Sequence, residues 1–323
     1  MRRKRTITAT IAAAVLTAGL GGCGTDTPET AAGRAGIGSN DRGGSSSPAP
    51  APKPQRVKVA QAVWYAGLKL ELGTLAYEPP EESTTTIPSM DLGEALTLDV
   101  AITNLATTQG PSSVPLTLEI DNQHYEGNLT GVTGLPGSAT TKGTFTFTVP
   151  TTIGDLTTGT IVVGDADGAQ AVVPLVSAGK RVTLEPQTLL AAPQESVVAE
   201  LRYKVTACQL RADLLNEHDQ LRKTERSVAC QVDIQYTGNT PGGHTIANEN
   251  FRLKLPDGTV QAAEKYPIKL LSSQEVERDL LVRFTIPWPA SGAYAIQLLD
   301  LGHLGRNPPT PQNTGEVPIS ISK

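Results

Sequence analysis

The sequence predicts an all-β protein in which two antiparallel β-sandwiches follow one another along the chain. Its 323 residues include 31 Gly and 24 Pro but only 4% aromatic residues, a composition that suits short strands and many turns better than a helical bundle. Apolar and polar residues alternate in many short stretches, which is the period of half-buried strands. Several of these stretches recur in the second half of the chain, at shifts that drift from 133 to 137 residues. We therefore expect two related domains, each long enough to bury its own core.

The chain begins with a basic segment, Arg2 to Arg5, which an apolar run from Ile7 to Leu20 follows. The run is too short for an ordinary transmembrane helix but fits the apolar region of a secretory signal peptide. It ends in Leu20-Gly21-Gly22-Cys23, which resembles the bacterial lipobox. The resemblance implies that residues 1–22 are a lipoprotein signal peptide and that the Cys23 thiol takes a diacylglyceryl group. The alternative is an ordinary cleaved signal with an incidental cysteine.

The expected acyl chains on Cys23 place the protein at the cell membrane, on its extracytoplasmic face. The chain has 27 Lys and Arg against 32 Asp and Glu, a net charge of −5. This acidic balance argues against a general nucleic-acid binder. It also argues against a polybasic patch as the membrane attachment, so the acyl chains must supply it.

Residues 23–55 are expected to form a disordered tether. Apart from Ile37, the tether has no large apolar residue, and it is made mainly of Gly, Ala, Ser, Thr and Pro with scattered charges. Such a segment cannot bury enough apolar surface to offset its chain entropy. Its Pro-rich end, Ser47 to Pro54, is expected to be stiffer and polyproline-like.

The two predicted sandwiches span residues 56–178 and 179–323, and their first strands are expected to start at Leu68 and Leu201. In the first of these strands the apolar positions change parity at Gly73, which predicts a β-bulge. The next strands, near Leu96 to Thr103 and Cys230 to Thr237, align at a shift of 134. Further on, the sequence Phe147-Thr148-Val149-Pro150 matches Phe284-Thr285-Ile286-Pro287.

Cys208 and Cys230 are expected to form a disulfide in the second sandwich. By their alignments they replace Leu75 and Leu96, which are expected to face each other in the first core. Export removes the reducing cytosol, which favours a disulfide. A metal pair and a redox-active dithiol are the alternatives, although the chain has no Cys-x-x-Cys.

The connection from Gln209 to Ser227 shows a weak helical pattern, so we expect a long polar loop with one or two helical turns, clamped at its base by the disulfide. Asp167-Gly168 and Asp257-Gly258 are expected hairpin turns. Later strands are expected near residues 280–286, 293–299 and 317–321.

These features together, above all the segment Asn-Phe-Arg-Leu-Lys-Leu-Pro-Asp-Gly from Asn250 to Gly258, resemble a known group of domains. They are similar to the immunoglobulin-like domains of uncharacterised function in lipoproteins and secreted immunogenic antigens of Gram-positive, actinobacterial-type bacteria. The resemblance covers most of Val57 to Ile321. It implies tandem immunoglobulin-like sandwiches in an extracytoplasmic setting, and it carries over no catalytic residues.

We expect no catalytic residue, cofactor or metal site. Ser177-Ala178-Gly179-Lys180 matches the Ser-x-x-Lys of penicillin-recognising enzymes without their partner motifs. Asp165-Ala166-Asp167-Gly168 is similar to a calcium loop but lacks the closing Glu, so a turn is the simpler interpretation. Trp288, held between two prolines, is the candidate binding residue, because Trp is enriched at interaction hot spots. Alternatively, it caps the sandwich or packs at the domain junction.

The leading hypothesis is a non-catalytic, lipid-anchored binding or interaction protein of the cell envelope. Its partner would be an unknown protein or cell-wall component, and no nucleic acid. One alternative is an envelope ligand carrier or enzyme with a site between the two domains. The other is a structural spacer.

Overall fold

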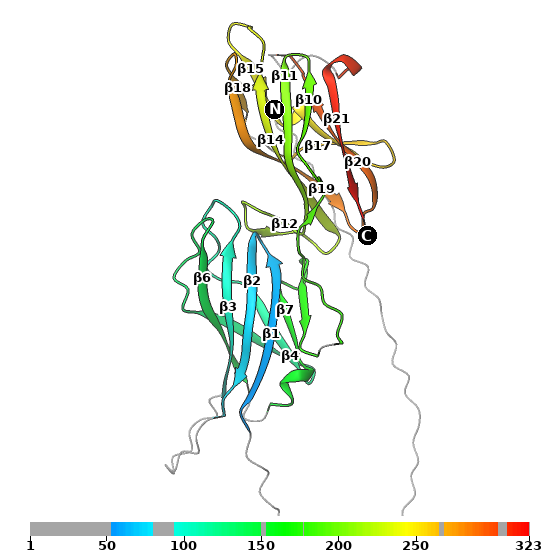
Figure 1. The fold of residues 1–323 in the computed structure, drawn as a ribbon. Helices are drawn as coiled ribbons and strands as arrows, with labels where there is room; N and C mark the ends of the chain where they lie inside the picture. The colour runs from blue at the N-terminus through cyan, green and yellow to red at the C-terminus, as the bar shows by residue number, and fades with distance from the viewer. Residues whose placement is uncertain are drawn as a thin grey trace, which may run out of the picture. The chain divides into compact units, whose positions relative to one another are not determined.

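The computed structural model describes residues 53–79, 94–149, 153–176, 178–264, 268–302 and 309–322. In these residues the protein is all-β, as the sequence predicts: its strands pair antiparallel and no α-helix occurs (Figure 1). The helical elements in the described residues are the short 3₁₀ turns η1 (Leu156–Thr158), η2 (Asn248–Asn250) and η3 (Pro311–Asn313).

The first eight strands form one sheet, which we call the N-terminal body (residues 53–176). Its strand order is β1-β2-β3-β6-β5-β4-β7-β8. The strands are β1 (Gln55–Tyr65), β2 (Leu68–Tyr77), β3 (Glu94–Asn104), β4 (Leu116–Ile120), β5 (Gln123–Thr130), β6 (Thr140–Val149), β7 (Thr160–Val163) and β8 (Ala171–Pro174).

The remaining strands form the C-terminal body (residues 187–322). One sheet has the order β10-β11-β14-β19 with β9 beside β11, and a second has the order β17-β16-β20-β21. A short ladder joins β15 to β18, and β12 pairs with β13 as a separate hairpin. The strands are β9 (Gln187–Thr188), β10 (Gln194–Val198), β11 (Leu201–Arg211), β12 (Asp213–Leu214), β13 (Asp219–Gln220), β14 (Glu225–Tyr236), β15 (His244–Ile246), β16 (Phe251–Lys254), β17 (Val260–Ala262), β18 (Lys269–Leu271), β19 (Val276–Pro287), β20 (Gly292–Leu299) and β21 (Thr314–Ile321).

The strand orders of the two bodies correspond. Reading β10 for β1, β11 for β2, β14 for β3 and β19 for β6 reproduces one half of the first sheet, and β17, β16, β20 and β21 reproduce β5, β4, β7 and β8. The difference is that β5 pairs with β6 in the first sheet, whereas β17 and β19 belong to different sheets. This agreement in topology is what two related halves would produce.

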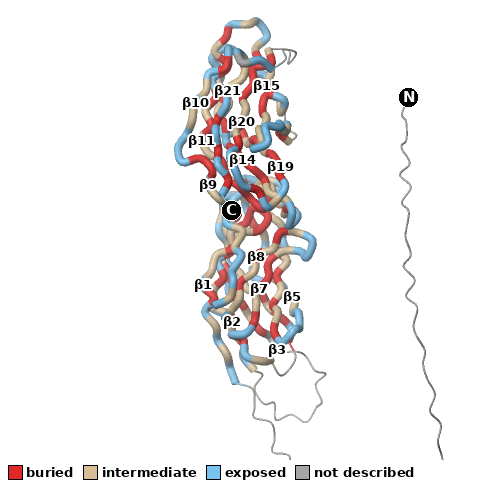
Figure 2. The backbone as a smooth tube through the Cα atoms, turned by 90° about the vertical axis from the view of Figure 1, so that its right-hand side faces the viewer, coloured by how far each residue is buried: buried red, intermediate tan, exposed pale blue. Residues whose placement is uncertain are grey.

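Each body has its own hydrophobic core, built by the alternating residues of its strands. Leu68, Leu70 and Leu72 of β2 are buried in the first core, and Leu201, Tyr203 and Val205 of β11 are buried in the second. Figure 2 shows such buried positions recurring along the strands of both bodies. Burial on one face of each strand explains the two-residue period of the sequence.

The predicted bulge in β2 is present, and β11 has one too. The pairing of β2 with β3 shifts between Leu72 and Leu75, and that of β11 with β14 shifts between Val205 and Ala207. In β2 the shift takes in Gly73, where an added Cβ would lie 3.1 Å from the Cβ of Asp99 on the neighbouring strand. Because the bulge adds one residue to β2, the residues that face the core have even numbers before it and odd numbers after it. This explains the change of apolar parity, since Leu72 and Leu75 are buried in the same core.

The expected opposition of Leu75 and Leu96 is wrong by one pair. Leu75 lies opposite Leu98, and Leu96 lies opposite Tyr77. In the structure Leu98 corresponds to Cys230, a shift of 132 residues where the sequence alignment used 134. Both shifts are even, so both keep each residue of β3 on the same face as its counterpart in β14, and the alternation of apolar residues could not distinguish them.

Two segments differ from the prediction. The first sheet begins with β1, which precedes the strand expected at Leu68. Trp64 and Tyr65 are the last two residues of β1. The connection after β11 has no helical turn: Asp213–Leu214 pairs with Asp219–Gln220 as a hairpin. The leucines of this connection lie in different structural elements: Leu210 belongs to β11, whereas the Leu221 N–H donates to the Ala212 carbonyl. Their helix-like spacing therefore does not form a single apolar face.

Candidate functional site

Cys208 and Cys230 are joined, as the sequence predicts. They lie directly opposite each other in the β11–β14 register, their Cα atoms are 4.1 Å apart and their sulfur atoms are at bonding distance. Both are fully buried in the second core. They take the place of Leu75 and Leu98 in the first core, so a covalent bond replaces a leucine contact.

Trp288 is half-buried at the end of β19. It packs against the second core, and the Arg226 guanidinium lies over its ring at 4.8 Å. Its backbone N–H donates to the Thr224 carbonyl at 2.7 Å. Burial lowers the pKa of Arg226, which stays a cation. The residue therefore has the capping environment that the sequence offered as its alternative role, and partner binding at Trp288 stays a prediction.

Cys23, the signal peptide, the tether up to Pro52 and Ser177 lie outside the described residues. Asp167-Gly168 forms a turn between β7 and β8, where the Gly168 N–H donates to the Asp165 carbonyl. Within the described ranges, no group of three or more His, Cys, Asp or Glu is arranged to hold a metal ion.

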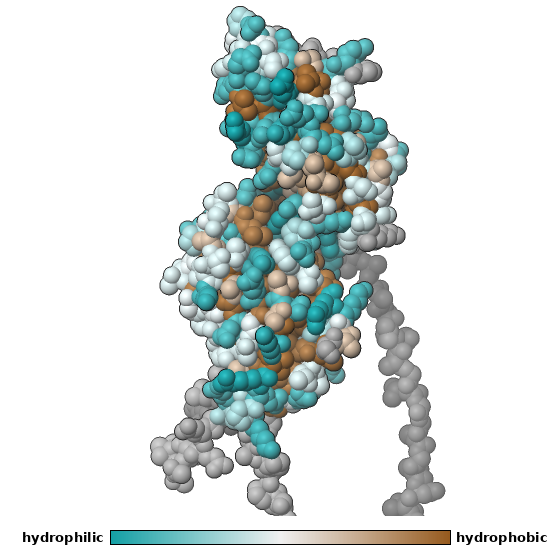
Figure 3. Space-filling model, viewed as in Figure 1, coloured by the Kyte–Doolittle hydropathy of each residue, from teal (hydrophilic) through white to brown (hydrophobic). Residues whose placement is uncertain are grey.

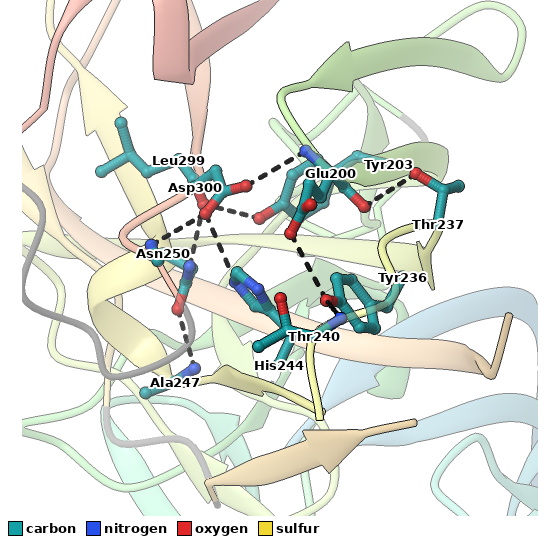
Figure 4. Close-up of polar contacts among 11 residues, drawn as sticks. Glu200, Tyr203, Tyr236, Thr237, Thr240, His244, Ala247, Asn250, Leu299 and Asp300 are labelled. Carbon is teal, nitrogen blue, oxygen red and sulfur yellow. Dashed lines mark hydrogen bonds and ion pairs between the residues drawn. The ribbon is translucent and has the colours of Figure 1, made fainter. Parts of the chain in front are cut away.

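Three buried ionisable side chains and one buried asparagine lie together in the C-terminal body (Figure 4). We call Tyr203, His244, Asn250 and Asp300 the polar cluster. All four side chains are 6% exposed or less. They come from β11, β15, η2 and the end of β20, so four separate segments of the chain meet there.

One backbone carbonyl, that of Leu299, and one carboxylate, that of Asp300, make most contacts in the polar cluster. The Leu299 carbonyl accepts hydrogen bonds from the Tyr203 hydroxyl at 2.6 Å and from the Asn250 amide at 2.8 Å. The Asp300 carboxylate lies 3.4 Å from His244 Nε2 and accepts the Glu200 N–H at 3.2 Å. Because these bonds reach backbone groups, the cluster fastens the loops before β11 and after β20 to the core.

The electrostatics keep the buried phenol neutral. Burial raises the pKa of Tyr203 well above its usual range, and the negative charge of Asp300 raises it further, while the hydrogen bond with Asn250 acts in the opposite direction. A neutral phenol is needed here, since the hydroxyl must donate to Leu299. The cluster therefore works as a structural fastening that water does not reach.

We expect Tyr203→Phe to lower the free energy of unfolding of the C-terminal body by about 1–1.5 kcal/mol, because it removes one buried hydrogen bond. The chain has two tryptophans, so Trp288 fluorescence in a Trp64→Phe background follows the C-terminal body in urea. The matched control is Tyr294→Phe, whose hydroxyl has no hydrogen bond to the described part of the chain. A change for Tyr203→Phe as small as the control's contradicts the prediction.

A second polar arrangement joins the two bodies. Arg211 and Asp213 form a bidentate ion pair, with Nε–Oδ1 and Nη2–Oδ2 distances of 2.7 and 3.1 Å, and their side chains are 4% and 5% exposed. Asp213 Oδ2 also accepts the Gly67 N–H at 2.8 Å. The β12–β13 hairpin is thereby held by its own body and in turn holds the β1–β2 turn.

Glycine is required in that turn. Gly67 has φ +77°, and a Cβ there would lie 2.5 Å from the Leu215 carbonyl oxygen of the hairpin. On the other side of the hairpin, Gln220 accepts the Ala66 N–H at 2.8 Å and donates to the Ala169 carbonyl at 2.9 Å. Sequence reasoning missed this junction because its partners are about 50 to 150 residues apart.

Tyr65 lies at the same junction, and we expect its phenol to titrate late. Burial raises the pKa of Tyr65 to about 12, helped by the charge of Asp165, to which its hydroxyl donates at 3.3 Å, and by Asp167 and Asp219. An unfolded tyrosine ionises near pH 10, so between about pH 10 and 12 the unfolded chain holds fewer protons and stability falls as pH rises.

The measurement is urea unfolding at about pH 9 and about pH 11 for wild type and Tyr65→Phe. Wild type should lose more stability between the two pH values than the variant does. Phenolate absorbance should show one late-titrating group in wild type that the variant lacks. Equal pH dependence of the two proteins would sink the prediction.

The largest hollows lie on sheet surfaces. One of about 640 Å³ covers β2, β3 and β6 and is lined by Gly73, Asp99 and Gly143 among others. A second of about 400 Å³ lies at the β4–β5 turn beside Asp121 and His124, and a third of about 390 Å³ follows β19 beside Leu281 and Arg283. Only the second of these three hollows is lined by a histidine, and none of the three is lined by Cys, Ser or Tyr.

Comparison with known proteins adds no family. No protein-family model matches the chain, and no curated protein matches it either. Across the described residues there is also no helix with the length and apolar character needed to cross a bilayer.

Proposed function

We propose that this chain is a lipid-anchored, non-catalytic interaction protein on the extracytoplasmic face of the cell membrane, built from two immunoglobulin-like sandwiches. The corresponding strand orders of the two bodies support the tandem arrangement. The lipobox-like Leu20-Gly21-Gly22-Cys23 supports the anchor. The buried disulfide is compatible with export, because disulfides persist outside the reducing cytosol.

The observation that carries the interaction role is a group of exposed apolar side chains in the C-terminal body. Ile268, Leu270 and Val276 are 73%, 61% and 42% exposed. Ile268 precedes β18, Leu270 lies in β18 and Val276 begins β19, and we call these three residues the apolar tip. Figure 3 shows that apolar residues occupy only parts of a surface that is otherwise largely polar. Single exposed apolar residues are ordinary, but three within nine residues mark a contact surface.

Charged side chains border the apolar tip. Lys269 and Glu277 form an ion pair at 2.8 Å, and each lies between or next to tip residues in the sequence. An apolar centre with a polar border is the usual composition of a protein interface. We therefore infer that the tip contacts another protein of the envelope.

The test is crosslinking in intact cells. Wild type should form a defined crosslinked product that the triple variant Ile268→Ser, Leu270→Ser, Val276→Ser loses at least about tenfold, the effect of removing 1.4 kcal/mol of binding free energy. The matched control is Val197→Ser, which removes a 66% exposed valine from β10 of the same body. Trp288→Leu is a further arm for the predicted contact at that residue. Undiminished crosslinking by the triple variant would remove the tip as the contact surface.

The anchor has its own test. Cys23→Ser should abolish incorporation of a labelled fatty acid and release the protein from the membrane fraction, because two acyl chains give stable anchoring. The control is Cys208→Ser with Cys230→Ser, which should remain membrane-bound. A membrane-bound Cys23→Ser protein would exclude the lipid anchor.

A further inference from the structure

The ring of His218 bridges the β12–β13 hairpin and the N-terminal body. Its Nδ1 lies 2.9 Å from the Ala66 carbonyl oxygen, and its Nε2 lies 3.2 Å from the Thr108 hydroxyl oxygen. The Thr108 hydroxyl also donates to the Asn216 carbonyl at 2.9 Å. Three hydrogen bonds thus share two ring nitrogens and one hydroxyl.

Counting the protons fixes the charge of the ring. A carbonyl only accepts, so His218 Nδ1 must carry a proton to bind Ala66. The single hydroxyl proton of Thr108 is already given to Asn216, so Nε2 must carry a proton as well. A neutral imidazole has only one N–H. All three bonds coexist only when His218 is an imidazolium.

Loss of a proton therefore costs the junction one contact. With a neutral ring that keeps its bond to Ala66, the Thr108 hydroxyl must choose between Nε2 and the Asn216 carbonyl. The other bonds of the hairpin, from Gly67 to Asp213 and from Ala66 to Gln220, involve no histidine. We propose that His218 is a pH-sensitive latch that holds the hairpin to the N-terminal body more firmly in its protonated form.

The charged groups around the junction are mostly acidic. The 105–110 loop that carries Thr108 has no charged residue. The other elements contribute Tyr65 at the end of β1, Lys69 near the start of β2, Asp165 and Asp167 in the β7–β8 loop, Glu217 and Asp219 in the hairpin, and the pair of Asp213 with Arg211, the last residue of β11. Histidine is the side chain whose charge ordinarily changes between pH 5 and 8.

The latch gives the protein a way to change the freedom between its two bodies. Under mildly acidic conditions the hairpin stays closed on the Ala66–Gly67 turn, and at higher pH it opens more often. The proposal is independent of the anchor and of the apolar tip, because it uses only the contacts at the junction.

Hydrogen–deuterium exchange of the full chain tests it. The amides of Ala66 and Gly67 are covered by Gln220 and Asp213, so peptides that contain them report opening of the hairpin. After correction for the intrinsic exchange rate, protection should be about three- to tenfold higher at about pH 5.5 than at about pH 8, the effect of losing one ordinary hydrogen bond.

His218→Asn is the central variant. His218 has φ 56°, a conformation that asparagine tolerates, and the asparagine amide can still donate without titrating. The variant should lose the pH difference, and so should Thr108→Val, which removes the exposed hydroxyl. His124→Asn, at an exposed histidine of β5, should keep it.

Two results would overturn the latch. One is equal protection of these amides at both pH values in wild type. The other is a pH difference that persists in both His218→Asn and Thr108→Val. Unchanged exchange of β14, at the centre of its sheet, verifies in each variant that the C-terminal body is folded.

Discussion

Replacing Cys208 and Cys230 together by alanine is expected to lower the free energy of unfolding of the C-terminal body by about 3 kcal/mol. The two residues are 22 apart in sequence, so the crosslink removes a substantial part of the chain entropy of the unfolded state. Urea unfolding followed by Trp288 fluorescence in the Trp64→Phe background measures the change. Trp64, observed in a Trp288→Phe background, should report an almost unchanged N-terminal body.

Reduction supplies the control. A thiol reductant should destabilise the wild-type C-terminal body by a similar amount and leave the double alanine variant unaffected. A loss below about 1 kcal/mol in both experiments would mean that the disulfide adds little beyond the packing of two small side chains, contrary to the prediction.

Phe284→Ala is expected to have a larger effect, about 3–5 kcal/mol, because it opens a cavity in a well-packed core. Phe284 is fully buried and lies opposite Val228 on the neighbouring strand. Its counterpart Phe147 is also fully buried and lies opposite Leu96. The measurement is again urea unfolding, read from Trp288 for Phe284→Ala and from Trp64 for Phe147→Ala.

The pair of variants also tests whether the bodies unfold separately. Each should lower chiefly the transition of its own body, because the two cores share no residue. If Phe284→Ala lowers the Trp64 transition as much as the Trp288 transition, the bodies form one cooperative unit and the assignment of costs to each body is wrong.

The sequence predicted those parts of the fold that depend on local patterns. The alternation of Leu68, Leu70 and Leu72 identified a strand, and the parity change at Gly73 identified a bulge, because both follow from the geometry of a single chain segment. The disulfide was predicted because the repeat alignment and the expected export both pointed to the same two cysteines, although the alignment matched Cys230 to Leu96 and the structure matches it to Leu98.

The errors arose where contacts between residues far apart in the sequence determine the local structure. The opposition of Leu75 and Leu98 could not be distinguished from a slip of two residues, since both keep the leucines on one face. The hairpin at Asp213 was expected to be partly helical because its leucines have helix-like spacing. The prediction failed because the hairpin's hydrogen-bond partners, Ala66 and Gly67, lie in the other body and far away in the sequence. The polar cluster was missed entirely, because His244, Asn250 and Asp300 come from distant segments and each alone is an ordinary polar residue.

One difference between the bodies has a mechanical consequence. Four residue pairs join β5 to β6, from Gly127–Phe147 to Thr130–Thr144. Between β17 and β19, the described residues show no such ladder: one backbone hydrogen bond runs from the Glu264 N–H to the Arg283 carbonyl. The other contacts use side chains: Gln261 donates to the Thr285 carbonyl, and the Glu264 carboxylate accepts the Thr285 hydroxyl and pairs with Arg283. We expect these side-chain contacts to open before a continuous backbone ladder does. Local opening of the C-terminal body should therefore start between β17 and β19 and admit solvent beside Thr285, while the β5–β6 ladder keeps the corresponding strands of the N-terminal body paired.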